Sequence, residues 1–303
     1  MTTNVAQSVD TQASLFSYFQ RMGIVCTRTI KRFIRSLTTL AKNPEMPIAA
    51  VSENPAEAKA IYRLMKSEKV SDDAILEAQR IETVRRIVAH AEPVILLVQD
   101  TSELNYAGLK ATSGLGDGTA KNRALHLHTG IAMTTSGQTL GLIHQDCWAR
   151  DPELRGQRKV NRPLEEKESN KWVKCALASV NGLPASVRAV HVGDREADFF
   201  EFFHTLEQHG QAYLVRAVQD RITDPQDTDQ QDDDQQNKWL FDRVRKQEVA
   251  GTFRVNIPRD SRRGLLARET ALEIRYVQSQ IQVPYHLKQK LGDSNTLTCT
   301  IIQ

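Results

Sequence analysis

The sequence predicts a mixed α/β protein, in which a small helical domain precedes the α/β core and a β-rich insertion follows it. Three observations carry this prediction. Residues 25–91 place apolar side chains at helical spacing, residues 92–219 alternate apolar strands with helices, and residues 239–303 show strand patterns. The 303 residues are 40% hydrophobic and 25% charged, which is typical of a globular chain with about two domains.

The helical domain begins with the segment "RTIKRFIRSLTTLAK", residues 28–42. Its apolar side chains recur at the helical period and predict an amphipathic helix; they are Ile30, Phe33, Ile34 and Leu37. Two further helix starts are indicated at Asn54-Pro55 and at Ser71, because proline suits the first helical position and Asn and Ser cap helices. Residues 1–24 are polar, and we expect them to be irregular or disordered.

Basic side chains gather on the same predicted helix. They are Arg28, Lys31, Arg32 and Arg35. A basic helix can contact DNA phosphates without reading the base sequence. The whole chain is only mildly basic, with a net charge of +3, so this cluster is a better indication of a DNA partner than the total charge. The alternative is a solvated helix face, which is what most runs of charge are.

The α/β core begins at Pro93 with "PVILLVQDTSEL", a continuous apolar run that is typical of a strand covered on both faces. Two antiparallel strands joined at Ser136-Gly137 follow within residues 123–150. The order then continues as a helix over 165–180, a buried strand over 186–194, a helix over 195–210 and a strand over 211–218.

The last part of the chain changes character twice. Residues 220–238 are rich in Asp and Gln and poor in apolar side chains, which predicts an acidic mobile loop. The segments that follow, within 239–303, read as strands. The sequence stops at Gln303 inside an apparent strand, and we interpret the chain as a truncated product.

Two aspartates end two of the apolar strands, Asp100 after "VILLVQ" and Asp194 after "VHVG". Ligands usually bind at such strand ends in an open α/β sheet. Two carboxylates brought together there repel each other unless a cation lies between them, and Mg²⁺ prefers oxygen ligands. A pair of metal ions can activate the attacking oxygen and stabilise the leaving oxygen in phosphoryl transfer. The alternative for either aspartate alone is a helix cap or a turn.

Glu196 and Asp198 lie beside the second aspartate. We interpret them as residues at the start of a helix whose carboxylates complement the helix dipole. Arg195 is equally consistent with steering a phosphate and with offsetting its acidic neighbours. His126 and His128 share one side of a strand and His144 lies on the next strand, but a third zinc ligand with convincing spacing is missing. Core or polar-face histidines are therefore the preferred interpretation. The tryptophans at 148, 172 and 239 are read as packing residues.

Several classes of protein are not indicated. The four cysteines are far apart and form no CxxC pair, so neither a zinc ribbon nor a disulfide framework is predicted, and a reducing cytoplasm is expected. The sequence contains no apolar run of about 18 residues that would span a membrane. It also shows no secretory signal at its start. A Ser-His-Asp hydrolase is disfavoured because a GxSxG elbow is absent from the sequence.

Four sequence blocks occur in this order along the chain: "VQDTSELNYAG", "LHLHTGIAMTTSGQTLGLIHQDCWAR", "EEKESNKW" and "GDREADFFEFF". Together they resemble insertion-sequence transposases of the IS-four group, relatives of the Tn-five transposase, from about residue 28 to the end. The resemblance implies a ribonuclease-H-like catalytic core and a DDE triad that binds two Mg²⁺ ions, with Mn²⁺ as a possible substitute. It also implies an N-terminal helical domain that contacts transposon ends.

By this resemblance Asp100, in "QDTS", matches the first aspartate of the triad, and Asp194, in "DREAD", matches the second. The family implies cut-and-paste transposition: hydrolysis at the transposon end, and then attack of the freed 3′-hydroxyl on target DNA. The implied partners are transposon-end and target DNA and a second copy in a homodimeric synapse. The implied location is the bacterial cytoplasm, in association with the nucleoid, with no membrane partner.

The chain departs from the family at two places. The family's third carboxylate lies in a pattern Tyr-x2-Arg-x3-Glu-x6-Lys, which this sequence lacks. Assigning Glu248, Glu269 or Glu273 instead would be forced, because all three lie in or beside predicted strands of the insertion. The family's Gly-Asp-x-Arg-like turn before the basic helix is also not recognisable.

The sequence therefore predicts a DDE transposase of the IS-four type that lacks its third catalytic glutamate and is inactive alone. The alternative is a non-catalytic DNA-binding remnant that competes with intact transposase. A metal-dependent nuclease unrelated to mobility is a third reading, and it would need a complete acidic triad within the chain.

Overall fold

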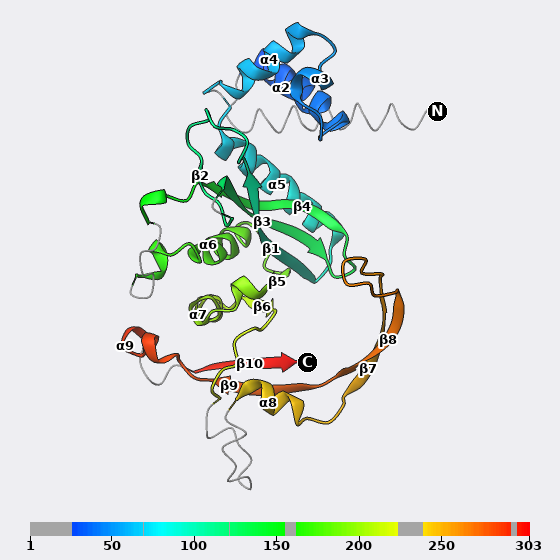
Figure 1. Cartoon of the computed structure of the whole chain (residues 1–303), viewed down its shortest axis with the longest axis vertical. Helices are drawn as coiled ribbons and strands as arrows, with labels where there is room; N and C mark the ends of the chain where they lie inside the picture. The colour runs from blue at the N-terminus through cyan, green and yellow to red at the C-terminus, as the bar shows by residue number, and fades with distance from the viewer. Residues whose placement is uncertain (1–25, 69, 121, 155–161, 224–238, 292–295) are drawn as a thin grey trace. The chain divides into compact units, whose positions relative to one another are not determined.

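A computed structural model describes residues 26–68, 70–120, 122–154, 162–223, 239–291 and 296–303 (Figure 1). The chain divides into two compact units. The first unit comprises Met1–Gln157 and Lys174–Ala189, and the second comprises Arg158–Val173 and Val190–Gln303. The stretch 1–24 and most of the loop 220–238 lie outside the described residues. None of the helices within the described ranges is long and apolar enough to cross a membrane.

The first unit opens with the helices that the sequence predicts and with one short helix, α3 (Ile48–Val51), that it does not. Helix α2 spans Thr27–Lys42, α3 spans Ile48–Val51, α4 spans Pro55–Met65 and α5 spans Asp72–His90. Both predicted helix starts are confirmed. The Asn54 side chain accepts a hydrogen bond from the Glu57 N–H at 3.0 Å, and the Ser71 hydroxyl accepts one from the Ala74 N–H at 3.2 Å. Each cap satisfies a backbone donor that the first turn of a helix leaves free.

The apolar side of α2 is buried against α4 and the start of α5. Ile30, Phe33 and Ile34 are buried as the helical period predicts, and they form a cluster with Leu64. The prediction that Leu37 shares this side is wrong, because its side chain is 38% exposed. The buried side turns instead toward Thr39, whose hydroxyl donates to the carboxylate of Glu57 on α4 at 3.2 Å.

The sheet of the first unit is antiparallel. Strand β1 spans Val94–Asn105, β2 spans Gly116–Asp117, β3 spans Arg123–Thr134 and β4 spans Thr139–Trp148. Strand β3 pairs with β1 and β4, and β2 pairs with the first two residues of β3. The predicted hairpin is confirmed: β3 and β4 are joined by a turn in which Gly137 has a φ of 91°, a conformation that favours glycine.

Helix α5 covers the sheet of the first unit (Figure 1). Its Ile87 is fully buried among Ile95 and Leu97 of β1 and Leu140 of β4. The Thr83 hydroxyl also donates to the Leu142 carbonyl oxygen at 2.6 Å. The contact between helix and sheet is therefore both apolar and hydrogen-bonded.

The second unit is built around a parallel strand pair. Strand β5 spans Arg188–Gly193, with its first two residues in the first unit, and it pairs in parallel with β6, Ala212–Val215. A short 3₁₀ turn η3, Arg195–Ala197, and helix α7, Phe200–Gln208, connect them. The prediction of one helix from residue 195 to 210 is therefore wrong, because the Asp194 side chain accepts from the Glu196 N–H and closes a separate turn.

Helix α6, Asn170–Ser179, contributes residues to both units. The remaining elements of the second unit are α8 (Leu240–Arg245), β7 (Gly251–Ile257), β8 (Arg268–Ile274), β9 (Tyr276–Ile281), α9 (Lys288–Leu291) and β10 (Leu297–Ile302). Short 3₁₀ turns lie at Pro152–Leu154, Leu164–Glu166 and Tyr285–Leu287. Strands β7 and β8 form one antiparallel pair, and β9 and β10 form another. The predicted mixed α/β class is confirmed.

We expect acid to destabilise the fold through His191 of β5. The side chain is fully buried, and burial lowers its pKa from about 6.5 to about 4. Between these values the unfolded chain binds a proton that the folded chain excludes, so stability is retained above pH 6.5 and falls as the pH drops toward 4. The contribution of this one group is about 3 kcal/mol.

Urea unfolding at pH 7, 6, 5 and 4.5 would check this expectation. The His191→Leu variant should lose less stability on acidification than the unmodified chain, while a His209→Gln variant, changed at an exposed site, should follow the unmodified chain. If the His191→Leu variant loses as much stability between pH 7 and 4.5 as the unmodified chain, the assignment is wrong.

Candidate nucleic-acid interface and carboxylate site

Helix α2 presents the predicted basic side chains on one face. Arg28, Lys31, Arg32 and Arg35 are all exposed. Their spacing of three, four and seven residues places them on the side opposite Ile30 and Phe33, because neighbours at this spacing share a helix face. Lys42, fourteen residues after Arg28, lies on the same face and was missed by the sequence analysis. The 100° helical period would have found it.

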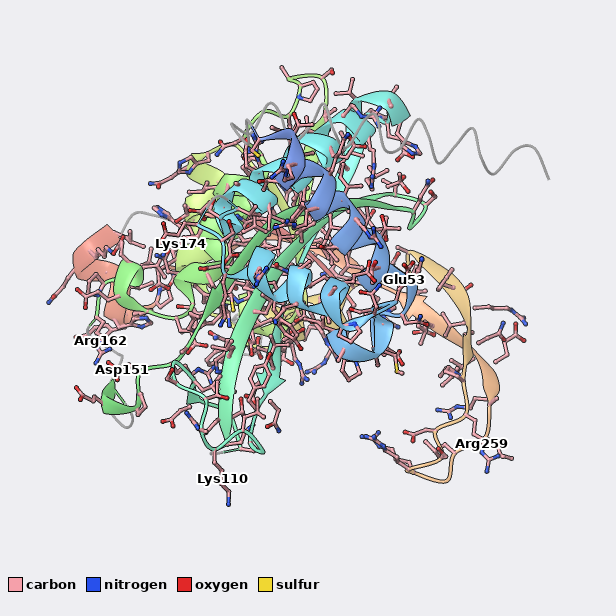
Figure 2. The ribbon with its side chains drawn as sticks, turned by 90° about the horizontal axis from the view of Figure 1, so that it is seen from above. Glu53, Lys110, Asp151, Arg162, Lys174 and Arg259 are labelled. Atoms are coloured by element: carbon pink, nitrogen blue, oxygen red, sulfur yellow. The ribbon has the colours of Figure 1, made fainter. Side chains whose placement is uncertain are left out.

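Arg35 differs from its neighbours because it is tied to two carboxylates. Its Nε lies 3.0 Å from Glu57 Oε1, and one Nη lies 3.3 Å from Glu53 Oε2. The pKa of Glu57 is lowered, first by the Glu53 backbone N–H, which donates at 2.7 Å, and then by Arg35. Arg35 is therefore partly neutralised, whereas Lys31 forms no ion pair among the residues that the structure describes. Figure 2 labels Glu53 on this part of the chain.

A shallow groove of about 470 Å³ runs beside α2. Its lining residues are Lys31, Ile34, Arg35, Thr38, Thr39, Lys42, Glu53 and Glu57. Lys31 in the first turns of α2 and Lys42 at its end line the groove on the basic face of the helix. All of the lining residues except Ile34 carry a charged or hydroxyl side chain, which suits contact with a charged backbone.

The prediction that Asp100 ends its strand is wrong, because β1 continues to Asn105 and Asp100 lies inside it, opposite Thr129 of β3. Its side chain is exposed, and its Oδ1 accepts a hydrogen bond from the Thr101 N–H at 2.8 Å. The neighbouring side chains Gln99 and Thr101 point to the other face of the sheet, where they contact His128. Strand alternation thus sends the carboxylate of Asp100 to the more exposed face.

Asp194 directly follows β5 in the second unit. Its side chain is exposed, and its Oδ1 accepts from the Glu196 N–H at 2.8 Å. The residue before it must be glycine, because a Cβ on Gly193 would lie 2.6 Å from Ala197 Cβ and 3.0 Å from the Trp172 ring. The tight turn therefore places Asp194 at the carboxyl end of a parallel strand, the edge where α/β sheets bind ligands.

The donor chemistry of both aspartates fits a hard cation. Each is an exposed carboxylate with one oxygen held by a backbone N–H, and carboxylate oxygens are the ligands that Mg²⁺ prefers. The two lie in different units, so their pairing stays a prediction. Within the described ranges, no group of three or more His, Cys, Asp and Glu side chains is arranged to hold a metal ion.

Other carboxylates are already engaged. On β1, Glu103 accepts from the Thr119 N–H at 2.6 Å and from Asn122 Nδ2 at 3.1 Å, and hydrogen bonds from Thr119 lower its pKa to about 2. On β8, Glu269 pairs with an arginine at 3.4 Å and Glu273 with another at 2.6 Å. Both glutamates of β8 thus have an arginine partner.

The charged residues after Asp194 have separate roles. Glu196 forms an ion pair with Lys171 Nζ at 3.1 Å. Arg195 is exposed, which is consistent with both roles expected for it. The expectation that Asp198 complements a helix dipole is wrong, because its carboxylate is buried and lies 2.5 Å from the Arg221 guanidinium.

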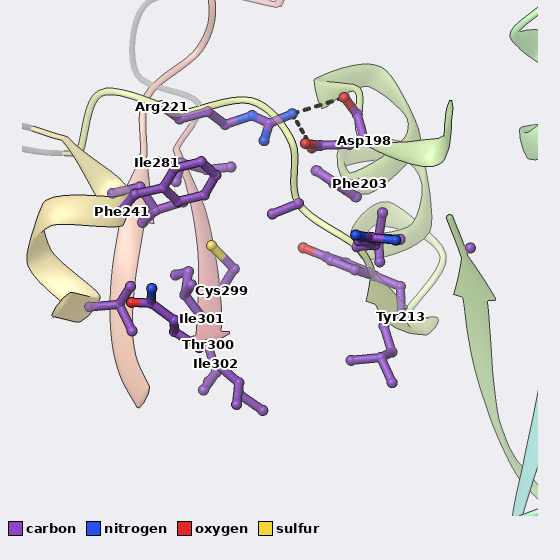
Figure 3. Close-up of a pocket in the computed structure, with 18 of the residues that line it drawn as sticks. Asp198, Phe203, Tyr213, Arg221, Phe241, Ile281, Cys299, Thr300, Ile301 and Ile302 are labelled. Atoms are coloured by element: carbon purple, nitrogen blue, oxygen red, sulfur yellow. Dashed lines mark hydrogen bonds and ion pairs between the residues drawn. The ribbon is translucent and has the colours of Figure 1, made fainter. Parts of the chain in front are cut away.

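The Asp198 carboxylate holds the loop after β6 against the turn after β5. Its Oδ2 accepts from the backbone N–H groups of Val218 at 2.6 Å and Gln219 at 2.8 Å. Arg221 also donates to the Asp198 carbonyl oxygen at 3.1 Å and lies over the Phe203 ring. Figure 3 shows this pair at the wall of a pocket of about 670 Å³ within the second unit. The residue pair is separated by 23 positions, so no local sequence signal could reveal it.

The histidines behave as polar-face residues. His128 is buried, and its two ring nitrogens contact Thr101 Oγ1 at 2.9 Å and Gln99 Oε1 at 3.2 Å. His126 is buried, contacts the Asp117 carbonyl oxygen at 3.0 Å and stacks on Trp148. His126 Nε2 and both ring nitrogens of His128 thus have polar partners within the first unit. Trp172 is buried, as predicted for a packing residue, whereas Trp239 is 41% exposed.

Comparison with known proteins adds one family. Residues 25–70, which include α2, α3 and α4, match the family model described as Transposase DNA-binding. No curated protein matches the chain.

Among solved structures, three complexes of the Mos1 transposase show weak structural similarity to this chain. The paired-end complex with left transposon end has a TM-score of 0.24 and 10% identity, covering 61% of this chain and 58% of that one. The strand transfer complex has a TM-score of 0.23 and 12% identity, with the same coverage. The pre-cleavage transpososome has a TM-score of 0.24 and 12% identity, covering 60% of this chain and 58% of that one. The chain thus spans less than two thirds of these proteins, and such TM-scores do not define a shared fold.

We expect the Asp198→Ala substitution to destabilise the second unit strongly. It leaves the Arg221 guanidinium buried without its carboxylate, which typically costs about 3–5 kcal/mol. The double variant Asp198→Ala/Arg221→Met removes the stranded charge and should recover most of this loss. Urea unfolding of both variants measures the difference. A loss below about 1 kcal/mol in the single variant, the size typical of exposed pairs, would contradict the buried role.

Proposed function

We propose that this chain is a transposase component that binds DNA through the basic face of α2. The observation that carries the proposal is the match of residues 25–70 to the Transposase DNA-binding family model, because this stretch contains the exposed cations of α2. The family relationship suggested by the DTS, EKESNKW and DREAD blocks, that of the IS-four group, gives the same function.

The physical basis of binding is electrostatic. Each lysine or arginine that neutralises a DNA phosphate releases a condensed counterion, and this release drives binding at low salt. Lys31 and Arg32 are the strongest candidates, because they are exposed near the middle of the face. Arg35 should contribute less, since Glu53 and Glu57 already offset its charge. A helix used in this way positions the protein on the duplex without selecting a base sequence.

The chemistry of transposition would belong to Asp100 and Asp194. When bound there, Mg²⁺, or Mn²⁺ in its place, would stabilise the negative charge that develops in the transition state of phosphoryl transfer. The two carboxylates would hold the cation through their free oxygens, while backbone N–H groups fix the orientation of their other oxygens. In this proposal hydrolysis at the transposon end precedes attack of the 3′-hydroxyl on target DNA, within a homodimeric synapse.

The missing glutamate limits this proposal. The pattern Tyr-x2-Arg-x3-Glu-x6-Lys is absent from the sequence, and Glu269 and Glu273 of β8 are engaged in ion pairs. We therefore propose that the chain alone binds DNA and does not cut it. The second candidate function follows from the same observation: a non-catalytic DNA-binding remnant that competes with intact transposase for DNA.

We expect the Lys31→Ala/Arg32→Ala variant to bind duplex DNA more weakly and with a flatter salt dependence. Each lost phosphate contact removes about 0.9 from the slope of log K against log salt, so the double variant should lose about 1.8. Fluorescence anisotropy with a labelled duplex at 50 to 200 mM salt measures the slope.

The matched control is Arg85→Ala/Arg245→Ala, which removes two exposed arginines that are already paired with Glu82 and Asp242. This control variant should keep nearly the full slope. An unchanged slope in the α2 variant would remove these side chains from the interface and withdraw the proposal.

We expect the purified chain to leave a supercoiled plasmid, carrying its own gene and flanking DNA, intact in the presence of Mg²⁺. The physical reason is that two carboxylates supply only part of the charge that a two-metal site needs. Agarose electrophoresis of nicked and linear products gives the readout. A Mg²⁺-dependent nick that disappears in Asp100→Ala would contradict the inactive reading and would identify a complete site.

A further inference from the structure

Strands β7 and β8 form a two-stranded antiparallel ribbon that is separate from the other sheets of the second unit. Seven residues on each strand pair without a bulge, from Gly251 opposite Ile274 to Ile257 opposite Arg268. Both faces of the ribbon are largely exposed, and Phe253 near its base remains 58% exposed. An isolated two-stranded ribbon is at best marginally stable in water, so a partner that covers it would be stabilising.

The ribbon and its loop are strongly basic. Residues 251–275 contain six arginines, at 254, 259, 262, 263, 268 and 275, against three carboxylates, at 260, 269 and 273. Ion pairs use one arginine for each carboxylate: Arg254 with Glu269, Arg263 with Asp260, and Arg275 with Glu273. Within the described chain this leaves Arg259, Arg262 and Arg268 without a carboxylate partner, and all three are exposed.

The loop at the end of the ribbon is well defined. Asp260 and Leu265 exchange two backbone hydrogen bonds of 3.0 Å across it. The Asp260 carboxylate also accepts from the backbone N–H groups of Arg262 and Arg263. These bonds fix the backbone and leave the Arg259 and Arg262 side chains directed into solvent, as Figure 2 shows for Arg259. The tip therefore presents fixed cations rather than a loose chain.

We propose that the β7–β8 ribbon is a second DNA contact that seats in the major groove of a duplex. The identity of the partner rests on the proposed function, but the surface is different from that of α2. Two strands about 4.8 Å apart, with their side chains, match a major groove about 12 Å wide. Seven residues per strand give a ribbon about 23 Å long, which is long enough to cross the groove.

Charge and shape select DNA among the candidate partners. The free guanidiniums at the tip complement phosphates and can donate to guanine edges, as arginine commonly does. Leu266 at the tip is 74% exposed and would contact thymine methyl groups or sugars. Duplex RNA is a poorer fit, because its major groove is deep and too narrow for side chains to read.

The test uses the full chain and the Arg259→Ala/Arg262→Ala variant, with the paired-arginine control Arg85→Ala/Arg245→Ala. Neither tip side chain supports the loop, whose bonds run through Asp260 and the backbone, so the variant should fold and give an unchanged circular-dichroism spectrum. We expect duplex affinity to fall about tenfold near 0.1 M salt and the salt slope to fall by about 1.8, while the control changes neither. Equal loss in the control would overturn the proposal.

A second arm asks whether the ribbon enters the groove. The same duplex is prepared with glucosylated 5-hydroxymethylcytosines, which fill the major groove and leave the phosphates unchanged, and also as duplex RNA. The unmodified chain should lose more affinity on filling of the groove than the tip variant does, and the tip substitutions should not weaken RNA binding. Equal effects of the tip substitutions on all three duplexes would show contact with phosphates alone and would overturn the groove assignment.

The two proposals fail separately. Normal DNA binding by Lys31→Ala/Arg32→Ala, together with weak DNA binding by the tip variant, would overturn the proposed contact through α2 and support the contact through the ribbon. The reverse result would overturn the ribbon and keep α2. If the unmodified chain binds no duplex DNA, the proposed function falls and the ribbon proposal falls with it.

Discussion

The burial of one side of α2 is the constraint that decides which of its side chains face solvent. Ile30, Phe33 and Ile34 lie against α4, and burying three such side chains contributes about 5–9 kcal/mol. Repulsion among exposed cations on the other side is far smaller, because water screens them and exposed charge interactions are worth about 1 kcal/mol or less. The apolar contacts therefore decide the orientation of the helix, and the cations Lys31 and Arg32 are held facing solvent.

The second unit relies on a polar counterpart of this apolar contact. The buried pair of Asp198 and Arg221 joins the loop after β6 to the turn after β5, and Gly193 allows that turn to close tightly. Asp194 sits at the start of the same turn and is exposed. A carboxylate proposed to hold a cation is thus carried on a segment whose position is fixed by neighbours that take no part in ligation.

The features that could be predicted from the sequence are local ones. The period of α2, the caps at Asn54 and Ser71 and the strand that ends before Asp194 depend on neighbouring residues, and the structure has them. The strand predicted to end before Asp100 instead continues to Asn105. The pairing of Arg35 with Glu57 and of Asp198 with Arg221 could not be predicted, because each joins residues more than 20 positions apart.

The most direct test of the central claim is protection of lysines from acetylation in the full chain, measured by mass spectrometry with and without duplex DNA. We predict that DNA protects Lys31 and Lys42 on the exposed face of α2, while Lys110 and Lys174, which are exposed elsewhere on the first unit, react at the same rate in both states. Equal reactivity of Lys31 with and without bound DNA would contradict the account.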